Sequence, residues 1–335
     1  MQRKNSIWLD QFGREKRKLR ISVTDRCNFK CQYCMPEHPK WMDKKHLLDF
    51  EALYQFCELM VQGGIQQIRI TGGEPLMRKG IIHFIQQLQQ LKSQGLQRIA
   101  MTTNAHYLKQ YAQALQDAGL DDLNISLDSL DETQFQQMTQ SALAPVLAGI
   151  EQALAVGLKV KINTVLMKGV NDCQILPLTA WAQQKQVMLR FIEYMPLDGD
   201  TQWCQQDVVT EQQILQVLAE KYQIESIAQD HEPARYYRLD LDHQIGIIST
   251  ISHTFCGACD RLRLTAKGEL YNCLFATQGL ALKDDILTWQ YRPSRQATTT
   301  LIHKIQNYIW HKAAGFHEIQ AKQQPRKITM HMLGG

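Results

Sequence analysis

Short apolar runs alternate with amphipathic stretches along the chain from Leu19 onward. Apolar runs of about four to eight residues are typical of strands that a parallel sheet buries on both faces. We predict six such strands, at residues 19–23, 67–70, 98–102, 123–127, 160–165 and 188–192. Three of the amphipathic stretches carry Leu, Ile, Phe and Met at helical spacing, at residues 51–60, 82–91 and 210–220. These apolar stripes are expected to face the core.

Strands that alternate with helices form a parallel sheet with helices on its outer face. Six strands are too few for the closed eightfold barrel, so the expected fold is α/β, a partial (β/α)6 TIM-type barrel. The rhythm changes after about residue 225, which predicts a barrel domain at 1–225 and a C-terminal region at 226–335. Ligands of such barrels gather where the strands end. The candidate mouth segments are residues 24–34, 71–75, 102–104, 126–128 and 193–195.

The first mouth segment holds three cysteines, Cys27, Cys31 and Cys34. A 4Fe-4S cluster normally takes four thiolates, and this spacing differs from that of the ferredoxin runs. Three ligands therefore suggest a cluster with one iron left open for an outside ligand. A structural zinc site is the alternative, but zinc usually takes cysteine pairs two residues apart and a fourth protein ligand nearby.

A second trio, Cys256, Cys259 and Cys273, lies in the C-terminal region. Taken alone it fits zinc as well as iron, because His253 could complete a Cys3His site. Two incomplete thiolate sets in one chain favour two clusters, each with an iron free to hold a small molecule. The remaining cysteines, at 57, 173 and 204, have no such spacing and are expected to be ordinary thiols.

Composition and charge narrow the setting of this chemistry. The 335 residues include 44% hydrophobic ones, enough for a packed core, and the net charge is only +4. This charge is too small for a nucleic-acid binder that works through a broad cationic face. There is neither a signal peptide nor an apolar run long enough to span a membrane, so we expect a cytoplasmic protein whose thiols stay reduced. The basic residues 14–20 are expected to form a solvated face, Arg20 excepted.

The turn Gly72-Gly73-Glu74-Pro75 follows the second predicted strand. Its bare backbone allows a small molecule to approach closely, beside a carboxylate. A tight turn with Pro75 opening a helix explains the same residues structurally. Near an open cluster iron, however, a cofactor amino group that needs hydrogen-bond acceptors becomes the better explanation.

The cysteine trio with Tyr33, together with this turn, resembles the radical S-adenosylmethionine (SAM) superfamily. More narrowly, three segments resemble the GTP 3',8-cyclase family of molybdenum-cofactor biosynthesis, namely residues 19–27, 69–75 and 255–263. The resemblance implies that the first cluster binds and reductively cleaves SAM to a 5'-deoxyadenosyl radical. It also implies that this radical removes the C3' hydrogen of GTP, after which the ribose attacks C8 of guanine.

The resemblance assigns residues to each ligand. Two 4Fe-4S clusters would be held by the two cysteine trios, the second of them binding guanine. SAM contacts would come from Tyr33, Gly73, Ser126 and Met195. GTP contacts would come from Arg20, Arg69, Thr102, Lys161, Arg261, Leu262 and Arg263. Guanidinium groups pair well with phosphate oxygens, although ion pairs within the barrel would also explain the cations at 20, 69 and 161. No catalytic side chain is assigned, because SAM and the clusters carry the radical chemistry.

The family also implies partners. These are GTP, a reductant of flavodoxin or ferredoxin type, and a downstream cyclic pyranopterin monophosphate synthase, with neither nucleic acid nor membrane. A homodimer is compatible with these expectations. The family further implies that the terminal Gly334-Gly335 enters the active site instead of fraying.

Two positions depart from the family pattern. Ala105 stands where glycine is common, and it would be strained if its φ angle is positive. The loop at residues 138–143 lacks an arginine that relatives often carry. Two alternatives stay open, a peptide-modifying radical SAM enzyme with an auxiliary cluster, and a noncatalytic iron-sulfur or zinc protein.

Overall fold

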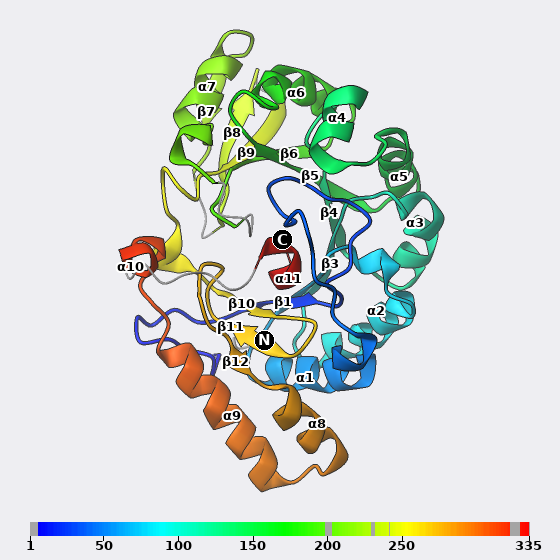
Figure 1. Ribbon diagram of the computed structural model, residues 1–335, viewed down its shortest axis with the longest axis vertical. Coiled ribbons are helices and arrows are strands. Elements are labelled where there is room, and N and C mark those ends of the chain that lie inside the picture. The colour runs from blue at the N-terminus through cyan, green and yellow to red at the C-terminus, as the bar shows by residue number, and fades with distance from the viewer. Residues whose placement is uncertain (1–5, 198–202, 229–231, 241, 322–328, 335) are drawn as a thin grey trace.

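The computed structural model describes residues 6–197, 203–228, 232–240, 242–321 and 329–334. One curved, open sheet of 12 strands runs through this part of the chain, in the order β12-β11-β10-β1-β2-β3-β4-β5-β6-β9-β8-β7 (Figure 1). Its strands are β1 Lys18–Ser22, β2 Gln67–Thr71, β3 Arg98–Thr103, β4 Asp122–Ser126, β5 Lys159–Leu166, β6 Met188–Glu193, β7 Ile224–Ser226, β8 Arg235–Leu239, β9 His243–Ile248, β10 Arg261–Leu264, β11 Glu269–Tyr271 and β12 Leu280–Ala281.

Helices cover the convex side of this sheet (Figure 1). They are α1 Phe50–Gln62, α2 Ile81–Gln89, α3 Leu108–Asp117, α4 Glu132–Thr139, α5 Ala144–Ala155, α6 Ile175–Gln184, α7 Glu211–Ala219, α8 Lys283–Tyr291, α9 Arg295–Trp310, α10 Phe316–Ala321 and α11 Met330–Leu333, of which the last two lie elsewhere. The six predicted strands correspond to β1–β6, and the three predicted helices to α1, α2 and α7, with ends shifted by one or two residues. The expected partial barrel is confirmed.

Two more parallel strands extend the predicted six. Strand β10 pairs with β1, Lys18 lying opposite Arg261, and β9 pairs with β6, Leu189 lying opposite Ile245. Both belong to the region after residue 225, so that region completes the same sheet. The division at residue 225 remains a proposal.

The apolar stripes of the helices explain why the strands hold their positions. In α1, Asp49 caps the first turn by accepting a hydrogen bond from the Ala52 amide at 2.7 Å, and Leu53, Phe56 and Met60 are fully buried. The same packing of helix on strand recurs around the sheet, so the carboxyl ends of β1–β6 meet at one mouth.

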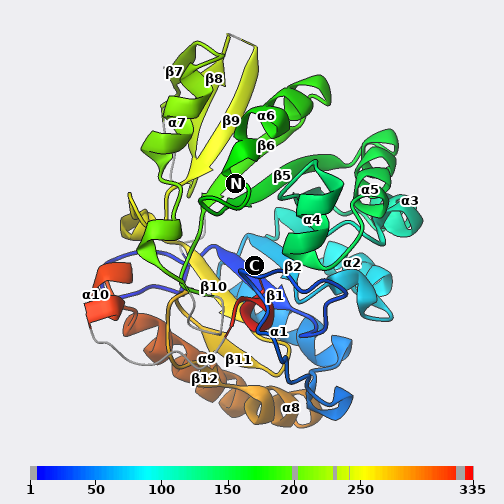
Figure 2. The same ribbon diagram turned by 45° about the horizontal axis from the view of Figure 1, so that its top comes forward.

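The C-terminal helix α11 lies on the concave side of the sheet, at its centre (Figures 1 and 2). The hairpin strands β11 and β12 and the helices α8 and α9 form the opposite margin of the molecule from β7 and α7 (Figure 2). Within the described ranges, no helix combines the length and apolar character needed to cross a membrane.

Candidate functional site

The first cysteine trio lies on the loop that follows β1. The Cys31 carbonyl accepts hydrogen bonds from the amides of Cys34 and Met35 at 3.0 and 2.9 Å, which curls the loop. The end of α4 holds the loop in place, because the Lys30 amide donates to Thr139 O at 2.9 Å. The segment 138–143, which lacks the family arginine, therefore supports the cysteine loop through backbone hydrogen bonding.

These cysteines are partly buried, and their thiols lie in surroundings that disfavour the thiolate in the absence of metal. Burial raises the pKa of Cys27 to about 12 and those of Cys31 and Cys34 still further. Iron binds thiolates, so loading this site must release protons. In the described part of the chain, no three His, Cys, Asp or Glu side chains are placed to share one metal ion. A cluster sets a different requirement, because each cysteine binds a different iron.

A cavity of about 1460 Å³ opens in front of the trio, inside the curve of the sheet. All four residues expected to contact SAM line it, namely Tyr33, Gly73, Ser126 and Met195. At Gly73 a Cβ atom would lie 2.3 Å from the Arg26 carbonyl oxygen, so only glycine fits. Close packing of this turn on the backbone that leads into the cysteine loop therefore requires glycine here.

Tyr33 is held by Asp128, which belongs to a predicted mouth segment but has no role of its own assigned from the sequence. Its hydroxyl donates to Asp128 Oδ2 at 2.7 Å, while the Val165 amide donates to Asp128 Oδ1 at 2.9 Å. Burial raises the pKa of Asp128 to about 6. Asp128 thus links the cysteine loop to the ends of β4 and β5.

The Gly-Gly-Glu-Pro turn also has the structural role considered above. Pro75 opens a short 3-10 helix, and the Glu74 carboxylate accepts from the Leu76 amide at 3.0 Å. Glu74 also accepts from Thr103 Oγ1 and the Asn104 amide, both at 2.8 Å. Burial raises the pKa of Glu74 to about 7. The carboxylate therefore joins the turns after β2 and β3 at the cavity wall.

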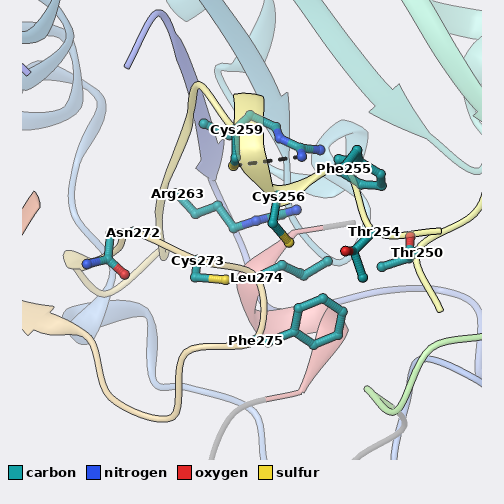
Figure 3. Close-up of a pocket in the computed structure, with 11 residues that line it drawn as sticks. Thr250, Thr254, Phe255, Cys256, Cys259, Arg263, Asn272, Cys273, Leu274 and Phe275 are labelled. Carbon is teal, nitrogen blue, oxygen red and sulfur yellow. Dashed lines mark hydrogen bonds between the residues drawn. The ribbon is translucent and has the colours of Figure 1, made fainter. Parts of the chain in front are cut away.

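The second cysteine trio lines a hollow of about 500 Å³ (Figure 3). The Sγ atoms of Cys256 and Cys273 are turned toward each other, and Arg261 Nη2 lies 3.8 Å from Cys259 Sγ. Burial alone would raise the pKa of Cys259, but Arg261 and Lys312 outweigh it and lower the pKa to about 6. This trio thus offers a thiolate at neutral pH, as a metal site requires.

His253 is not placed to complete a zinc site with this trio. Its Nδ1 atom lies 3.2 Å from Glu211 Oε2 and 3.3 Å from Ser252 Oγ. Across the described residues, His253 and the three cysteines do not form a group that could hold one metal ion. The geometry therefore argues against a Cys3His zinc site formed with His253.

A third, basic hollow of about 640 Å³ lies deeper in the barrel. Three arginines stand in register across neighbouring strands, Arg20 of β1 opposite both Arg263 of β10 and Arg69 of β2. Burial and these arginine neighbours hold the pKa of Arg20 well below its usual value. Like charges placed directly opposite in a sheet destabilise it. Asp122 Oδ1 lies 3.6 Å from Arg69 Nη2 and offsets the charge of that arginine, so an ion pair within the barrel accounts for part of the row. An anionic ligand would offset the charges of Arg20 and Arg263.

Arg261 lines all three hollows, and Arg20 lines both the large and the basic one. Thr250, Phe255 and Leu274 line both the large hollow and that of the second trio. The hollows therefore adjoin, and the two cysteine trios face one continuous space.

The other expected GTP contacts are spread over this space. Thr102 lines the large hollow, Lys161 the basic one, and Arg263 the large one and that of the second trio. Leu262 is fully buried in the hydrophobic core and lines none of the three hollows, so the structure does not bring it together with the other expected GTP contacts.

Sequence reasoning missed several polar residues inside the barrel. Arg190 and Asn163 lie opposite each other on β6 and β5, with Arg190 Nε donating to Asn163 Oδ1 at 3.0 Å. Among the described residues, Arg190 Nη2 and Asn124 Oδ1 are buried without a hydrogen-bond partner. Both residues line the large and the basic hollow, which fits a polar ligand there. Polar residues at alternate positions of β4 and β5, and the single arginine within β6, were the available signal.

The expectation of a solvated face at residues 14–20 is wrong for Arg14 and Lys16. Their exposed fractions are 9% and 0%, because both side chains pair with the buried Asp10. The other cysteines match their expected roles as ordinary thiols, Cys57 being buried in the core and Cys173 exposed.

Two expectations about backbone positions have clear outcomes. Ala105 has a φ angle of 62°, so the strain expected at this departure is present. Gly334 is buried, and its carbonyl accepts a hydrogen bond from Arg263 Nη1 at 2.6 Å. The tail therefore reaches the wall of the large hollow, and Gly335 lies outside the described residues.

Two known families match successive parts of the chain. The Radical SAM superfamily matches residues 21–182, and the family described as Molybdenum Cofactor Synthesis C matches residues 187–318. In fold, the chain is similar to Streptococcus suis SuiB bound to its precursor peptide SuiA, with a TM-score of 0.65 and 15% identity over 94% of this chain and 74% of that one.

Named relatives are closer in sequence. GTP 3',8-cyclase of Campylobacter jejuni is 44% identical over 83% of this chain and 86% of its own length. The GTP 3',8-cyclase of Staphylococcus saprophyticus is 41% identical over 80% and 81%, and that of Staphylococcus epidermidis is 36% identical over 97% and 98%. The chain therefore belongs to the GTP 3',8-cyclase family of radical SAM enzymes.

Proposed function

We propose that this protein cyclises GTP to (8S)-3',8-cyclo-7,8-dihydroguanosine 5'-triphosphate, a lyase reaction that opens molybdenum-cofactor biosynthesis. Family membership makes it a radical SAM enzyme of that pathway, with a 4Fe-4S cluster and SAM as cofactors. The observation that carries the choice of substrate is the row of Arg263, Arg20 and Arg69 between the two cysteine trios. A triphosphate would neutralise this row, because guanidinium groups bind phosphate oxygens in pairs.

The residues divide the work by position. Cys27, Cys31 and Cys34 would hold the first cluster, which supplies an electron to cleave SAM. The groove formed by Tyr33, Gly73, Ser126 and Met195 would orient SAM against that cluster. The second trio would hold the second cluster, beside the guanine of GTP. Removal of H3' from the ribose would then occur in a space from which the protein excludes water.

Further parts of this proposal concern the setting. GTP contacts would come from Arg20, Arg69, Thr102, Lys161, Arg261 and Arg263, joined by Arg190, whereas Leu262 lines none of the hollows. A flavodoxin or ferredoxin would supply the electron, and a cyclic pyranopterin monophosphate synthase would consume the product. The cytoplasmic setting, the two-domain division and a homodimer belong to the same set of proposals.

An anaerobic assay tests the proposal. The protein is reconstituted with iron and sulfide, reduced, and given SAM with or without GTP, and 5'-deoxyadenosine and cyclised nucleotide are followed by mass spectrometry. We expect cyclised nucleotide and 5'-deoxyadenosine in equal amounts with GTP. Deoxyadenosine without nucleotide product would overturn GTP as substrate but leave the radical chemistry. ATP in place of GTP is the matched control, because it offers the same triphosphate with a different base.

A further inference from the structure

A buried ionic cluster lies outside the three hollows, in the N-terminal segment. Asp10 Oδ2 accepts from Arg14 Nε at 2.7 Å and from Lys16 Nζ at 2.6 Å. The side chains of Asp10 and Lys16 are fully buried, and that of Arg14 is 7% exposed. Buried charges are costly unless further hydrogen bonds compensate them, so the partners of the two cations matter.

Those partners are the backbones of two cysteines of the second trio. Arg14 Nη1 donates to the Cys256 carbonyl at 2.8 Å, and Lys16 Nζ donates to the Cys259 carbonyl at 2.9 Å. Arg14 thus holds the first residue of the short 3-10 turn Cys256–Ala258, and Lys16 holds the residue that follows the turn. The Cys256 carbonyl also accepts from the Cys259 amide at 3.2 Å, which closes the turn, and the two cations of the ionic cluster add side-chain donors to the carbonyls of Cys256 and Cys259.

Arg14 also ties in a third stretch of backbone, which follows α9. Its Nη1 and Nη2 atoms donate to the carbonyls of Ala314 and Ala313 at 2.7 and 2.9 Å. This stretch packs directly on the turn, because a Cβ atom at Gly315 would lie 2.9 Å from Cys256 Cβ. One guanidinium group therefore joins the N-terminal segment, the cysteine turn and the end of α9.

The main chain continues the same attachment. The amides of Arg17 and Lys18 donate to the Asp260 carbonyl at 2.9 and 3.0 Å, and the pairing of β1 with β10 begins directly after it. The cysteine turn is thus anchored at both ends before any cluster is bound. Ligands that their neighbours hold in place bind metal more tightly, because less ordering remains to be done on binding.

We propose that Asp10, Arg14 and Lys16 are positioning residues that hold Cys256 and Cys259 in the arrangement that the second cluster needs. This inference rests on the proposed function, since it assumes that the second trio binds a cluster.

The test counts iron at the second site alone. In a background with Cys27→Ala, Cys31→Ala and Cys34→Ala, iron and sulfide per chain are measured after anaerobic reconstitution, and iron loss to a chelator is titrated. We expect Arg14→Gln to weaken iron retention by about 10- to 100-fold, as supporting residues of metal sites typically do. Arg14→Lys keeps a cation beside Asp10 but cannot bridge the three backbones, so its loss should be intermediate.

Arg17→Gln is the matched control. Arg17 is a cation of the same segment, but its side chain contacts Glu15 and Gln66 and not the cysteine turn. In the otherwise native chain, Arg14→Gln should leave SAM cleavage at the first cluster unchanged, which also shows that the variant folds.

Three outcomes would overturn the inference, and they are distinct. Full iron retention by Arg14→Gln would overturn it while leaving the second cluster in place. An equal loss in Arg17→Gln would reduce it to a general effect of charge. Absence of iron from the parent background would remove the second cluster itself, and this part of the proposed function with it.

Discussion

At the scale of single residues, Arg20 shows a conflict between stability and binding. Its neighbours Arg263, Arg261 and Arg69 repel it, and the whole row is turned toward the hollows. Sites that are strained in the free protein and relieved by a ligand are common where function requires them.

We therefore expect Arg20→Gln to have opposite effects on the two properties. The free protein should gain up to about 1 kcal/mol in free energy of unfolding, because one member of a like-charged row is removed. GTP affinity should fall about 10-fold or more, because a charge-assisted hydrogen bond contributes roughly 1.5–3 kcal/mol. Urea unfolding and calorimetric titration with GTP measure the two effects. Arg238→Gln, at a half-exposed pair with Glu225, should change neither; a less stable Arg20→Gln would contradict the prediction.

Glu74 predicts a dependence of stability on pH. Its pKa is raised by burial from 4.5 to about 7 in the folded chain. Between these values the unfolded chain loses the proton that the folded chain keeps, so stability falls as pH rises. Each pKa unit corresponds to about 1.4 kcal/mol, so the loss should approach about 3 kcal/mol by pH 7.

Urea unfolding of the iron-free chain and of Glu74→Gln, at pH 5 and pH 7 with reductant, measures this loss. The variant lacks the carboxyl group, so the native chain should lose stability relative to it over this interval. A difference between the two proteins that stays constant with pH would show that Glu74 is ionised normally.

At the scale of elements, local patterns were enough for β1–β6 and their helices, because each strand and helix shows its own periodicity. Strand β10 was not predicted, because Arg261–Leu264 is short and its partner strand β1 lies near the other end of the chain. The cysteine trios stand out by their spacing, and the structure places each trio at a hollow, while their role as cluster ligands stays a prediction. Arg190 and Asn124 were not, because alternation shows two faces of a strand but not which face lines a hollow. Arg14 and Lys16 were misplaced because charges lie in solvent by default.

The loop between β9 and the second trio depends on one carboxylate at the end of β6. Glu193 Oε2 accepts from the amides of Ile251 and Ser252 at 2.8 and 2.9 Å, and Oε1 accepts from the Glu211 amide at 3.1 Å. Both oxygens face donors, so the amide of a glutamine could satisfy only one side.

Glu193→Gln should therefore destabilise the protein by about 1–3 kcal/mol, the cost of a buried donor left without a partner. Hydrogen exchange should quicken in residues 249–255 and not in α1. Glu225→Gln, an exposed carboxylate, is the control. Unchanged exchange in the loop would mean that its own backbone holds it.

At the scale of the whole molecule, the C-terminal tail closes the space that the barrel leaves open. Met330 lines the large hollow, Leu333 is fully buried, and the His331 ring contacts Trp41 at 6.0 Å between centroids. The last described residue, Gly334, lies against Thr71 at the end of β2 and accepts from Arg263. The chain's end thus contacts both the SAM side and the arginine row.

Gly334→Ala tests whether this closure matters. Gly334 has a φ angle of +75°, and a Cβ atom there would lie 1.8 Å from Thr71 Oγ1, so the tail must move. A shift of about 1 Å in a closing segment can cost about 100-fold in rate, so cyclisation should fall by that order. SAM cleavage should be affected less than cyclisation, because Gly334 itself contacts Thr71 and Arg263, whereas the tail meets the loop of the first trio through another residue, His331, beside Cys34. Coupling between the two products would then be lost.

Gly157→Ala is the control that distinguishes the effect of the steric clash at Gly334 from the effect of backbone strain. Gly157 has a φ angle of +80° with nothing within 4 Å of an added Cβ atom, so it carries the same strain without the clash. In limited proteolysis the tail should be cleaved faster in Gly334→Ala but not in Gly157→Ala. The ratio of deoxyadenosine to cyclised nucleotide should likewise rise only in Gly334→Ala. If that ratio stayed at one in Gly334→Ala, closure by the tail would be unnecessary for the reaction, and the arginine row would have to hold GTP without it.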